Sequence, residues 1–459
     1  MFKRLLIANR GEVAVRIARA ARALGIEPIG ISSEADRNSS WLERMEDVVV
    51  IGGTAPTDSY LQRERVLEAA KLTRCSALHP GWGFLSEDPR FAALCEEHGV
   101  TWVGPPPSVM RTMSLKTPAK KAMQAAGLEL IPGSDGLTSS VDEAASRAAE
   151  VGYPVILKAD AGGGGRGMRL CRSEDELREA YPSAAAEAQG AFGNGALYLE
   201  RYLEGGRHIE VQILADRFGK AIHLGERECS VQRNHQKLVE ESPSPALSPE
   251  ERQRLGRSAA RAAAAIGYVG AGTIEFLLDD AGRLCFIEMN TRLQVEHPVT
   301  ELVTGIDIVQ KQLEIAANGR LGIEQVEVQT NGAAIECRIN AEDPTRNFQP
   351  TPGTLTEFEI GTDHGPGLIR VDTHLTAGEE VSPFYDSLIA KVIAYGKTRD
   401  QAIETMLATL QNARIEGVET TIPLHLEVLN SQEFRKGEYD TSRIPGWSPD
   451  KISSNVEAE

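Results

Sequence analysis

Apolar and polar positions in the first quarter of the chain alternate between two periods. An apolar run over residues 5–8 is followed by a stretch in which apolar side chains return every three or four positions, and Gly25 ends that stretch. The positions with this helical spacing are Val13, Ile17, Ala20, Ala21 and Leu24. A second strand is expected over residues 27–31, and the alternation of strand and helix continues to Gly104. Strand, helix and strand in repeated succession predict a doubly wound parallel sheet.

The pattern changes after the three prolines at residues 105–107, which interrupt any regular element. A buried strand is expected over residues 152–158. From about Ala196 longer β segments surround an alanine-rich helix over residues 252–266, and short alternating runs begin near Asn331. We therefore expect three domains, over residues 1–114, 115–330 and 331–446, and a polar tail over residues 447–459.

Composition narrows the possible partners. A chain of 459 residues with 41% hydrophobic composition can build a substantial core, but it is too long for one compact core. The formal net charge is -17, so the chain as a whole repels nucleic acid and anionic membranes. We expect no nucleic-acid or membrane partner, and any phosphate-binding site must be a local island of positive charge.

The six cysteines are scattered, and no two have the CxxC spacing of a zinc ribbon or a redox motif. Scattered thiols fit a reducing compartment. Residues 1–12 reach arginine, glycine and glutamate too soon for the apolar core of a signal peptide, and no apolar run has the length of a membrane span. These features predict a cytoplasmic protein.

A glycine-rich segment directly follows the strand expected to end at Lys158. Residues 162–165 are four consecutive glycines, and Arg166 and Gly167 come next. Consecutive glycines let the backbone approach a phosphate and present several N–H donors to it, and Lys158 adds a point charge. The segment is not a Walker loop because it lacks the GKS or GKT ending. A flexible surface loop is the alternative interpretation.

Two apolar runs on either side of residues 280–283 predict a β-hairpin. If Asp279 pairs with Leu284, Glu275 lies directly opposite Glu288. Like charges facing each other across two strands are destabilising by up to about 1 kcal/mol, and a bound divalent cation reverses that sign. The alternative is a register shifted by one residue, which turns one of the two glutamates to the other face.

Polar residues continue at every second position beyond this pair. In an extended segment alternate residues share a face, so one row holds Glu288, Asn290, Arg292, Gln294 and Glu296. The amide oxygen of Asn290 is a ligand that Mg²⁺ accepts. A guanidinium can hold a small planar oxyanion through two hydrogen bonds, and a carboxylate can take a proton from it. The alternative is an exposed strand face with ordinary ion pairs.

Two further stretches concentrate polar groups. Residues 230–237 bring Gln232, His235 and Lys237 together, and on composition alone they could form a solvated loop. Residues 335–340 alternate strictly, so Arg338 is expected to project from a half-buried strand. A single arginine on a strand is more often structural than catalytic.

The glycine segment, the paired carboxylates and Asn290 resemble the ATP-grasp superfamily. Four stretches, IANRGE, HPGWGFLSE, EMNTRLQVEHPVTE and YDSLI, are similar to the biotin carboxylase family, and the resemblance covers the chain up to its tail. The stretch over residues 292–301 is highly specific, whereas the glycine loop is not. The resemblance implies an α/β and α+β protein with a Rossmann-like N-terminal domain, a central ATP-grasp fold and a C-terminal mixed β domain. It also implies a lid subdomain over about residues 131–203.

The resemblance implies a role for each matching residue. ATP phosphates are assigned to Lys116, Lys158, Gly164 and Gly165. The adenine edge is assigned to Glu200, Arg201 and Leu203, mostly through backbone, and the nucleotide is lined by His208, Gln232 and His235. Mg²⁺ or Mn²⁺ is assigned to Glu275, Glu288 and Asn290. Bicarbonate is assigned to Lys237, Arg292, Gln294 and the backbone of Val295. Glu296 is the expected base, and Arg338 is expected to stabilise the ureido oxygen of biotin near Trp82.

The implied reaction has two steps. Deprotonated bicarbonate attacks the γ-phosphoryl group of ATP and gives carboxyphosphate and ADP, with cations neutralising the charge that is transferred. Carboxyphosphate then releases CO₂ beside biotin, and the liberated phosphate can take the proton of the biotin nitrogen. Closure of the lid would keep water away from the intermediate.

The chain departs from the family pattern at a few positions. Ser114 and Leu115 stand where a glycine and a small or acidic residue are common, and Trp82 stands where tyrosine is common. Arg201 stands where lysine is common, and Ala161 stands where some members have a glycine. None of these departures removes a charged group that the reaction needs.

The chain has no Met-Lys-Met segment of the kind that carries covalent biotin. The resemblance therefore implies that biotin arrives on a separate biotin carboxyl carrier protein, that a separate carboxyltransferase subunit completes the reaction, and that the chain forms a homodimer. Acetyl-CoA is the first expected acceptor, which would place the chain in fatty acid biosynthesis; another acyl-CoA, pyruvate and 2-oxoglutarate stay open. Another ATP-grasp ligase and a catalytically silent ATP-binding scaffold are the alternative functions.

Overall fold

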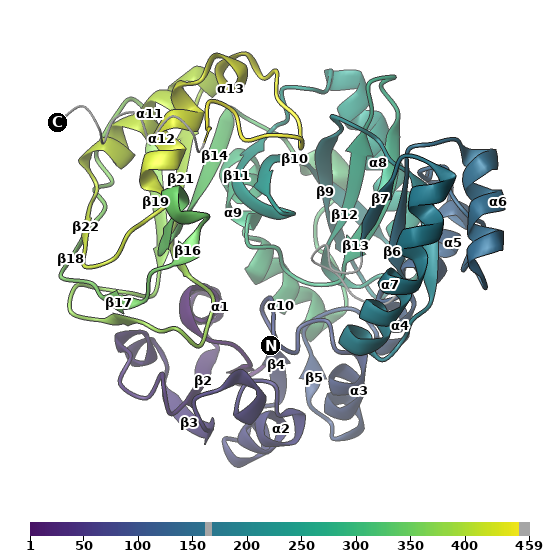
Figure 1. The fold of residues 1–459 in the computed structure, drawn as a ribbon. Helices are drawn as coiled ribbons and strands as arrows, with labels where there is room; N and C mark the ends of the chain where they lie inside the picture. Colours follow the sequence, from purple (N-terminus) through teal and green to yellow (C-terminus); the bar gives the residue numbers. More distant parts are fainter. Residues whose placement is uncertain (161–167, 449–459) are drawn as a thin grey trace.

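The structure is a computed structural model, and it describes residues 1–160 and 168–448. Its first sheet has five parallel strands in the order β3-β2-β1-β4-β5. These strands are β1 Arg4–Ile7, β2 Glu27–Ser33, β3 Asp47–Gly52, β4 Ala77–His79 and β5 Thr101–Trp102. The helices between and after them are α1 Gly11–Ala23, α2 Arg63–Leu72, α3 Pro89–Glu97 and α4 Pro107–Met113. The predicted doubly wound parallel sheet is confirmed (Figure 1).

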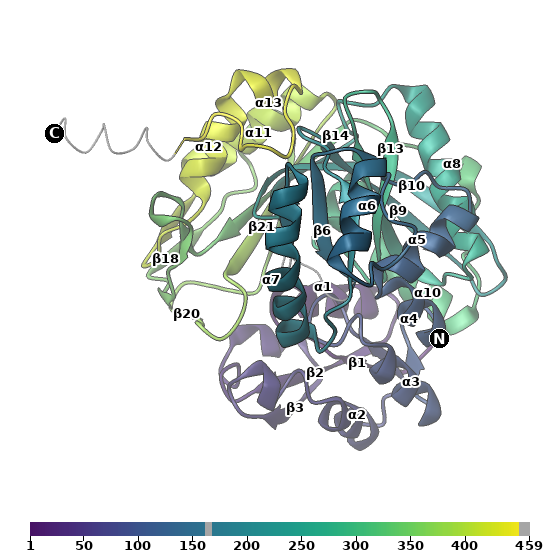
Figure 2. The same cartoon turned by 45° about the vertical axis from the view of Figure 1, so that its right-hand side comes forward.

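A second, smaller sheet has three antiparallel strands in the order β7-β6-β8. The strands are β6 Val155–Ala159, β7 Arg169–Cys171 and β8 Leu197–Arg201. The preceding helix is α5 Lys116–Ala125, and the covering helices are α6 Val141–Val151 and α7 Glu174–Phe192, which lie on the outside of the sheet in Figure 2. The strand expected over residues 152–158 begins only after Pro154, which has no N–H to donate to a strand ladder.

The largest sheet has eight antiparallel strands in the order β13-β12-β9-β10-β11-β14-β21-β19. They are β9 Arg207–Ala215, β10 Ala221–Arg233, β11 Gln236–Ser242, β12 Gly270–Leu278, β13 Leu284–Asn290, β14 Ala333–Asn340, β19 Leu368–Thr373 and β21 Leu388–Gly396. Strands from both sides of Asn331 therefore share one sheet. The C-terminal part of the chain is mixed in structure as predicted, but its long strands extend the central sheet.

Helices cover the eight-stranded sheet on both faces. They are α8 Pro249–Ala265, α9 His297–Thr304, α10 Ile308–Asn318, α11 Arg399–Asn412, α12 Ile422–Asn430 and α13 Gln432–Lys436. Short strands complete the C-terminal region at β15 Glu342–Asp343, β16 Gln349–Pro350, β17 Gly353–Thr354, β18 Glu357–Glu359, β20 Glu380–Val381 and β22 Arg414–Glu416. No helix in the described part of the chain is long and apolar enough to cross a membrane.

The alanine-rich helix shows how local sequence sets an element boundary. Helix α8 was expected from residue 252 and begins at Pro249, because Ser248 caps its first turn. The Ser248 hydroxyl accepts from the Glu251 N–H, and the Glu251 carboxylate accepts from the Ser248 N–H. Proline at the first helical position costs no hydrogen bond there.

The two faces of β14 belong to different cores. Ala334 packs with Val299 and Val303 of α9, whereas the next residue, Ile335, packs in the cluster that contains Ile403 of α11. Successive residues of a strand point to opposite faces. Glu336 and Arg338 therefore share the face of α9, and this is the face that bears the site described next.

Candidate active site

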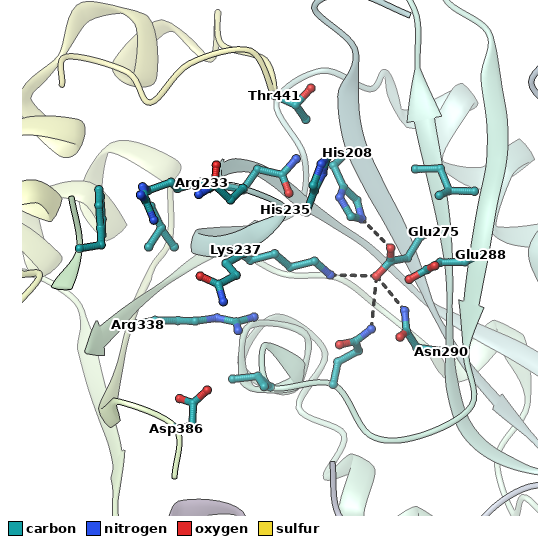
Figure 3. A pocket seen from close by; sticks show the side chains of 18 of the residues that line it. His208, Arg233, His235, Lys237, Glu275, Glu288, Asn290, Arg338, Asp386 and Thr441 are labelled. Atoms are coloured by element: carbon teal, nitrogen blue, oxygen red, sulfur yellow. Dashed lines mark hydrogen bonds and ion pairs between the residues drawn. The ribbon is translucent and has the colours of Figure 1, made fainter. Parts of the chain in front are cut away.

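A cleft with a volume of about 1170 Å³ opens on the α9 side of the eight-stranded sheet and extends to the three-stranded sheet. It is larger than the usual range for a small-molecule site, about 300–1,000 Å³. Within the described residues, the candidate site side chains line this cleft, except for those of Glu200 and Glu296, which lie buried behind its wall. Gly164, Gly165 and Ala161 lie outside the described residues. Figure 3 shows basic and acidic side chains from several strands directed into this one space.

Two lysines line the end of the cleft beside β6, and a third pairs with the same carboxylate as one of them. Lys116 opens helix α5 and forms an ion pair with Glu288, and Lys158 on β6 lies 2.5 Å from the Glu200 carboxylate. Lys120, one helical turn after Lys116, also forms an ion pair with Glu200. Burial, with neighbouring lysines, lowers the pKa of Lys158 to about 8 and that of Lys120 to about 7. These lysines can compensate the charge of a polyphosphate.

The segment expected to meet the adenine edge, mostly through backbone, lies along the cleft. Arg201 and Leu203 line the cleft. Glu200 instead turns its side chain to the two lysines, and only 3% of it is exposed. The backbone N–H of Arg201 donates to the Pro132 carbonyl at 2.7 Å, so this donor is already used within the protein.

Glu275 and Glu288 face each other across β12 and β13, as predicted, but the expected register at the turn is wrong. Leu278, not Asp279, pairs with Leu284, and a register shift beyond Phe276 restores the pairing of the two glutamates. A bulge places two residues opposite one and so changes the alternation locally. The turn closes through a hydrogen bond from the Asp279 N–H to the Arg283 carbonyl at 3.0 Å.

Cations and an amide surround the two facing carboxylates. Glu275 lies 3.0 Å from the Lys237 ammonium and 3.1 Å from His208 Nε2, and it accepts from Asn290 Nδ2 at 2.8 Å. Burial opposes ionisation, but Lys237 and His208 hold the pKa of Glu275 well below its ordinary value. Burial also lowers the pKa of His208, yet its acidic neighbours, Glu275 first, raise that pKa overall. Two carboxylates and an amide fit a hard divalent cation.

Lys237 lies at the centre of the buried part of the site. Its ammonium is 2.5 Å from Glu210, 3.0 Å from Glu275 and 2.6 Å from Glu296. These ionic contacts raise the pKa of Lys237 well above its ordinary value despite burial. Arg227, which is fully buried, also forms an ion pair with Glu210.

Glu296 joins Lys237 to Arg338. Arg338 lies 3.0 Å from Glu296 and donates from Nε to Glu240 at 2.6 Å. Although burial opposes ionisation, Lys237 and then Arg338 hold the pKa of Glu296 well below its ordinary value. Burial has the larger effect on Glu240 and raises its pKa to about 7. We call these residues the charge cluster: Glu210, Glu240, Glu275, Glu296, Arg227, Lys237 and Arg338.

The expected extended row beyond Asn290 is wrong in its backbone but still brings the polar groups together. Strand β13 ends at Asn290, residues 291–296 are irregular, and Glu296 has φ -81° and ψ 10° just before α9. Arg292 donates to Gln294 Oε1 and to Asn290 Oδ1, each at 3.0 Å, and lies 3.1 Å from Glu87. Pro298 at the start of α9 favours a helix there, so strand alternation cannot continue.

The strand that carries Arg338 is not half-buried as expected. Strand β14 pairs with β11 on one side and β21 on the other, and Ile335 and Glu336 are both fully inaccessible to solvent. Polar residues on this strand therefore face a buried charge network and not water. Arg338 itself is partly exposed, because its side chain reaches the cleft.

Residues 230–237 form a hairpin and not the solvated loop that composition left possible. Strands β10 and β11 meet at a two-residue turn in which Asn234 has φ 49° and His235 has φ 65°. Two successive positive φ angles are typical of a type I′ turn, whose twist suits a hairpin. The turn places His235, with Gln232 and Lys237 on either side, along the cleft (Figure 3).

Several members of the site are not predicted from the sequence, although some have a signal in it. Glu210 stands two residues after His208 on β9, so strand alternation could have placed both on one face. Lys120 stands four residues after Lys116 and therefore lies on the same side of α5. Glu87, which accepts from Arg292, ends the stretch HPGWGFLSE that resembles the family, but its partner lies more than two hundred residues away and could not be found from spacing.

Three family models match successive parts of the chain. Residues 1–110 match the N-terminal domain of biotin carboxylase, residues 116–324 match the ATP-binding domain of the carbamoyl-phosphate synthase L chain, and residues 336–445 match the C-terminal domain of biotin carboxylase. Biotin carboxylase 1 of Bacillus subtilis (strain 168) is 51% identical over 442 residues, which are 96% of this chain and 98% of that protein. The 2-oxoglutarate carboxylase small subunit of Hydrogenobacter thermophilus is 48% identical over 96% of this chain and 93% of its own length.

Solved structures give the same result. A complex of biotin carboxylase from Campylobacter jejuni with β,γ-ATP has a TM-score of 0.93 and 44% identity, over 96% of this chain and 98% of that one. The biotin carboxylase domain dimer of the Hydrogenobacter thermophilus 2-oxoglutarate carboxylase, in complex with MgADP, ADP and bicarbonate, has a TM-score of 0.92. It is 48% identical over 96% of each chain.

Proposed function

This chain belongs to the biotin carboxylase family, and from that premise we propose how the residues of its cleft divide the work of the reaction. The chain carries out the ATP-dependent carboxylation of biotin with bicarbonate, which is the first half-reaction of biotin-dependent carboxylases. The observation that carries the assignment is the meeting, in one cleft, of phosphate-side lysines, facing carboxylates and the charge cluster around Lys237.

ATP occupies the part of the cleft between the three-stranded sheet and β13. Lys116 and Lys158 compensate its phosphates, together with the lysine that sequence analysis missed, Lys120. Gly164 and Gly165 contribute N–H donors by the same assignment. The nucleotide is further lined by Glu200, Arg201, Leu203, His208, Gln232 and His235. Each lysine is paired with a carboxylate in the free protein, so ATP competes with Glu200 and Glu288 for them.

Mg²⁺ or Mn²⁺ binds at Glu275, Glu288 and Asn290. The donor set fits a hard cation because two carboxylates face each other across the hairpin and an amide lies beside them. Asn290 presents Nδ2 to Glu275, so an oxygen ligand from this residue requires its amide group to be turned over. The ion supplies positive charge beside the phosphates of ATP.

Bicarbonate binds between Lys237, Arg292, Gln294 and the backbone of Val295. Glu296 removes its proton, and the resulting oxyanion attacks the γ-phosphorus of ATP, so that the bond to the ADP oxygen breaks and carboxyphosphate forms. Lys237 and Arg338 depress the basicity of Glu296 in the free protein. A bound anion that takes up the donors of Lys237 weakens this effect and makes Glu296 the stronger base that the step needs.

Biotin binds beside Arg338 and Trp82. Carboxyphosphate dissociates into CO₂ and phosphate, phosphate accepts the proton of the ureido nitrogen, and that nitrogen forms the new bond to CO₂. Arg338 stabilises the negative charge that develops on the ureido oxygen. Trp82 donates from its indole N–H to Glu12 at 3.3 Å, which fixes the ring at the rim of the cleft.

The remaining assignments concern the assembly. Biotin is carried by a separate biotin carboxyl carrier protein, a separate carboxyltransferase subunit transfers the carboxyl group, and the chain acts as a cytoplasmic homodimer. Acetyl-CoA is the proposed acceptor, in fatty acid biosynthesis. One similar structure is a dimer, which supports the proposed homodimer. The three proposed domains cover residues 1–114, 115–330 and 331–446, and the second contains the lid at about residues 131–203. A tail over residues 447–459 follows, and its residues 449–459 lie outside the described part of the chain.

The test is phosphate release from MgATP by the purified protein, with and without bicarbonate and free biotin. Stimulation by both additions in the wild type, lost in Glu296→Ala, supports the assignment. ATP binding without turnover that depends on bicarbonate would favour a catalytically silent scaffold. Turnover that depends on bicarbonate but not on biotin would favour another ATP-grasp ligase.

A further inference from the structure

A lysine outside the predicted site lies fully buried behind it. Lys391 is on β21, between β14 and β19, and its side chain has no solvent exposure. It shares the face of α9 with Ile393, two residues further along the strand. Transferring an ammonium group from water to the protein interior costs several kcal/mol, and an apolar residue of equal size avoids this cost. The charge must therefore serve a contact that an apolar residue cannot make.

That contact is with the backbone of the bicarbonate segment. Lys391 Nζ donates to the Val295 carbonyl at 3.0 Å. Val295 lies in the irregular stretch 291–296, where no strand ladder orients the peptide groups. A peptide unit is planar, so holding the Val295 carbonyl also sets the direction of the following N–H and the position of the Glu296 Cα.

The same ammonium connects this segment to the rim of the cleft. Lys391 Nζ lies 3.0 Å from Glu12 Oε1, and that oxygen also accepts from the Trp82 indole N–H at 3.3 Å. Glu12 is in the first turn of α1 and is buried. A continuous series of polar contacts thus runs from the Val295 carbonyl through Lys391 and Glu12 to Trp82. One end lies where bicarbonate is assigned and the other where biotin is assigned.

Two further acidic groups lie on the same side of the sheet as this lysine. Asp372 lies 3.9 Å from Nζ and is otherwise held by Arg370 at 2.6 Å. Glu336 is fully buried on the same face of the sheet. Within the described part of the chain, neither of these acids forms a hydrogen bond or an ion pair with Val295 or Trp82. Asp372 therefore offers a matched control within the same buried group of charges.

We propose that Lys391 is a positioning residue that holds the Val295–Glu296 peptide for bicarbonate binding and deprotonation, and that Glu12 joins this contact to Trp82 on the biotin side. This inference rests on the proposed function. The ATP end of the cleft uses lysines on α5 and β6, which have no part in the connection. Loss of Lys391 therefore impairs the use of bicarbonate and leaves the affinity for ATP unchanged.

The experiment compares Lys391→Met, Lys391→Arg and Asp372→Asn with the wild type in steady-state ADP formation. Bicarbonate is varied at saturating MgATP and biotin, and MgATP is then varied at saturating bicarbonate. For Lys391→Met we expect KM for bicarbonate to rise about tenfold or more, as for a lost contact of about 1.4 kcal/mol, with KM for ATP within about twofold. Lys391→Arg keeps a donor and is expected to recover most of the loss, and Asp372→Asn is expected to keep the wild-type KM for bicarbonate.

A wild-type KM for bicarbonate in Lys391→Met overturns the inference, as does an equal rise in both KM values or the same rise in Asp372→Asn. If Lys391→Met does not fold, Glu12→Gln serves instead, because it removes the charge beside Nζ and keeps the shape. It is then expected to raise KM for bicarbonate alone, and wild-type values overturn the inference. A wild type that forms no ADP in response to bicarbonate rejects the proposed function itself, which separates the two failures.

Discussion

Replacing Glu296 with glutamine separates its role as a base from its role in the charge cluster. The cluster contains four carboxylates and three cations, and Glu296 contacts Lys237 at 2.6 Å and Arg338 at 3.0 Å. Glutamine keeps the shape and leaves three carboxylates facing three cations. No buried cation becomes unpaired, because Lys237 keeps Glu210 and Glu275, and Arg338 keeps Glu240.

Stability should therefore change little while activity falls strongly. Weakening a charge-assisted hydrogen bond costs about 1.5–3 kcal/mol, and the glutamine oxygen retains part of each contact. We expect Tm to fall by no more than about 5 °C. Loss of a general base lowers the rate about 10²- to 10⁴-fold. KM for ATP is expected to stay within about twofold, since Lys116 and Lys158 bind elsewhere in the cleft.

The assay is ADP release coupled to NADH oxidation, with bicarbonate and with or without free biotin, together with thermal unfolding of each variant. Glu240→Gln is the matched control, since Glu240 is equally buried and contacts Arg338 but not Lys237. It is expected to keep ADP release without biotin within about tenfold of the wild type. Glu296→Gln with more than a tenth of wild-type activity, or Glu240→Gln as inactive as Glu296→Gln, would refute the reasoning.

Three further predictions follow from the charges of the cleft. The pKa of Lys158 is lowered to about 8 and that of Lys120 to about 7, and ATP binds the protonated form of each lysine. The affinity for ATP is therefore expected to be highest below pH 7 and to fall as the pH rises past 8. Calorimetry in buffers of different ionisation enthalpy should detect proton uptake on ATP binding, and the absence of uptake at pH 8 would contradict this prediction. Lys237→Met leaves four carboxylates with two cations in the charge cluster, so it is expected to lower the free energy of unfolding by about 3–5 kcal/mol. This loss is expected to shrink as the pH falls and the carboxylates take up protons. Denaturant titrations at pH 8 and pH 6 measure the loss, and an equal loss at both pH values would count against the role of charge. Glu288→Gln removes one of the two facing carboxylates, so the Mg²⁺ concentration for half-maximal activity is expected to rise about tenfold or more. A Mg²⁺ titration at fixed ATP concentration measures this value, and an unchanged value would show that Glu288 is not a metal ligand.

Local pattern was sufficient for much of the fold. The N-terminal strands and helices have clear apolar periods, so the parallel sheet could be predicted from spacing alone. The facing of Glu275 and Glu288 was also predicted, although by a register that fails at the turn. The bulge lies between the Glu275–Glu288 pair and the Phe276–Phe286 pair and has no distinctive residue, and the correct pairing depends on how β12 lies against β9.

Contacts between distant segments could not be read from local pattern. Nothing near Arg338 indicates that its strand lies inside an eight-stranded sheet, because a buried strand that faces a charge network alternates in the same way as a strand that faces water. Glu87 and Lys391 likewise contact residues 291–296 from segments far away in the sequence. Their partners follow from the tertiary fold and not from spacing.

The shared sheet also limits where this protein can be cut. The family models treat the regions before and after residue 330 as separate units, yet β11 forms its ladder with β14 from Val239 to Ser242. A fragment ending at residue 330 would present β11 as an open strand edge, which is a template for aggregation. It would also leave the Glu240 carboxylate without Arg338. A shortened enzyme made for engineering or for inhibitor screening must therefore retain the polypeptide through β21, even if only the nucleotide site is wanted.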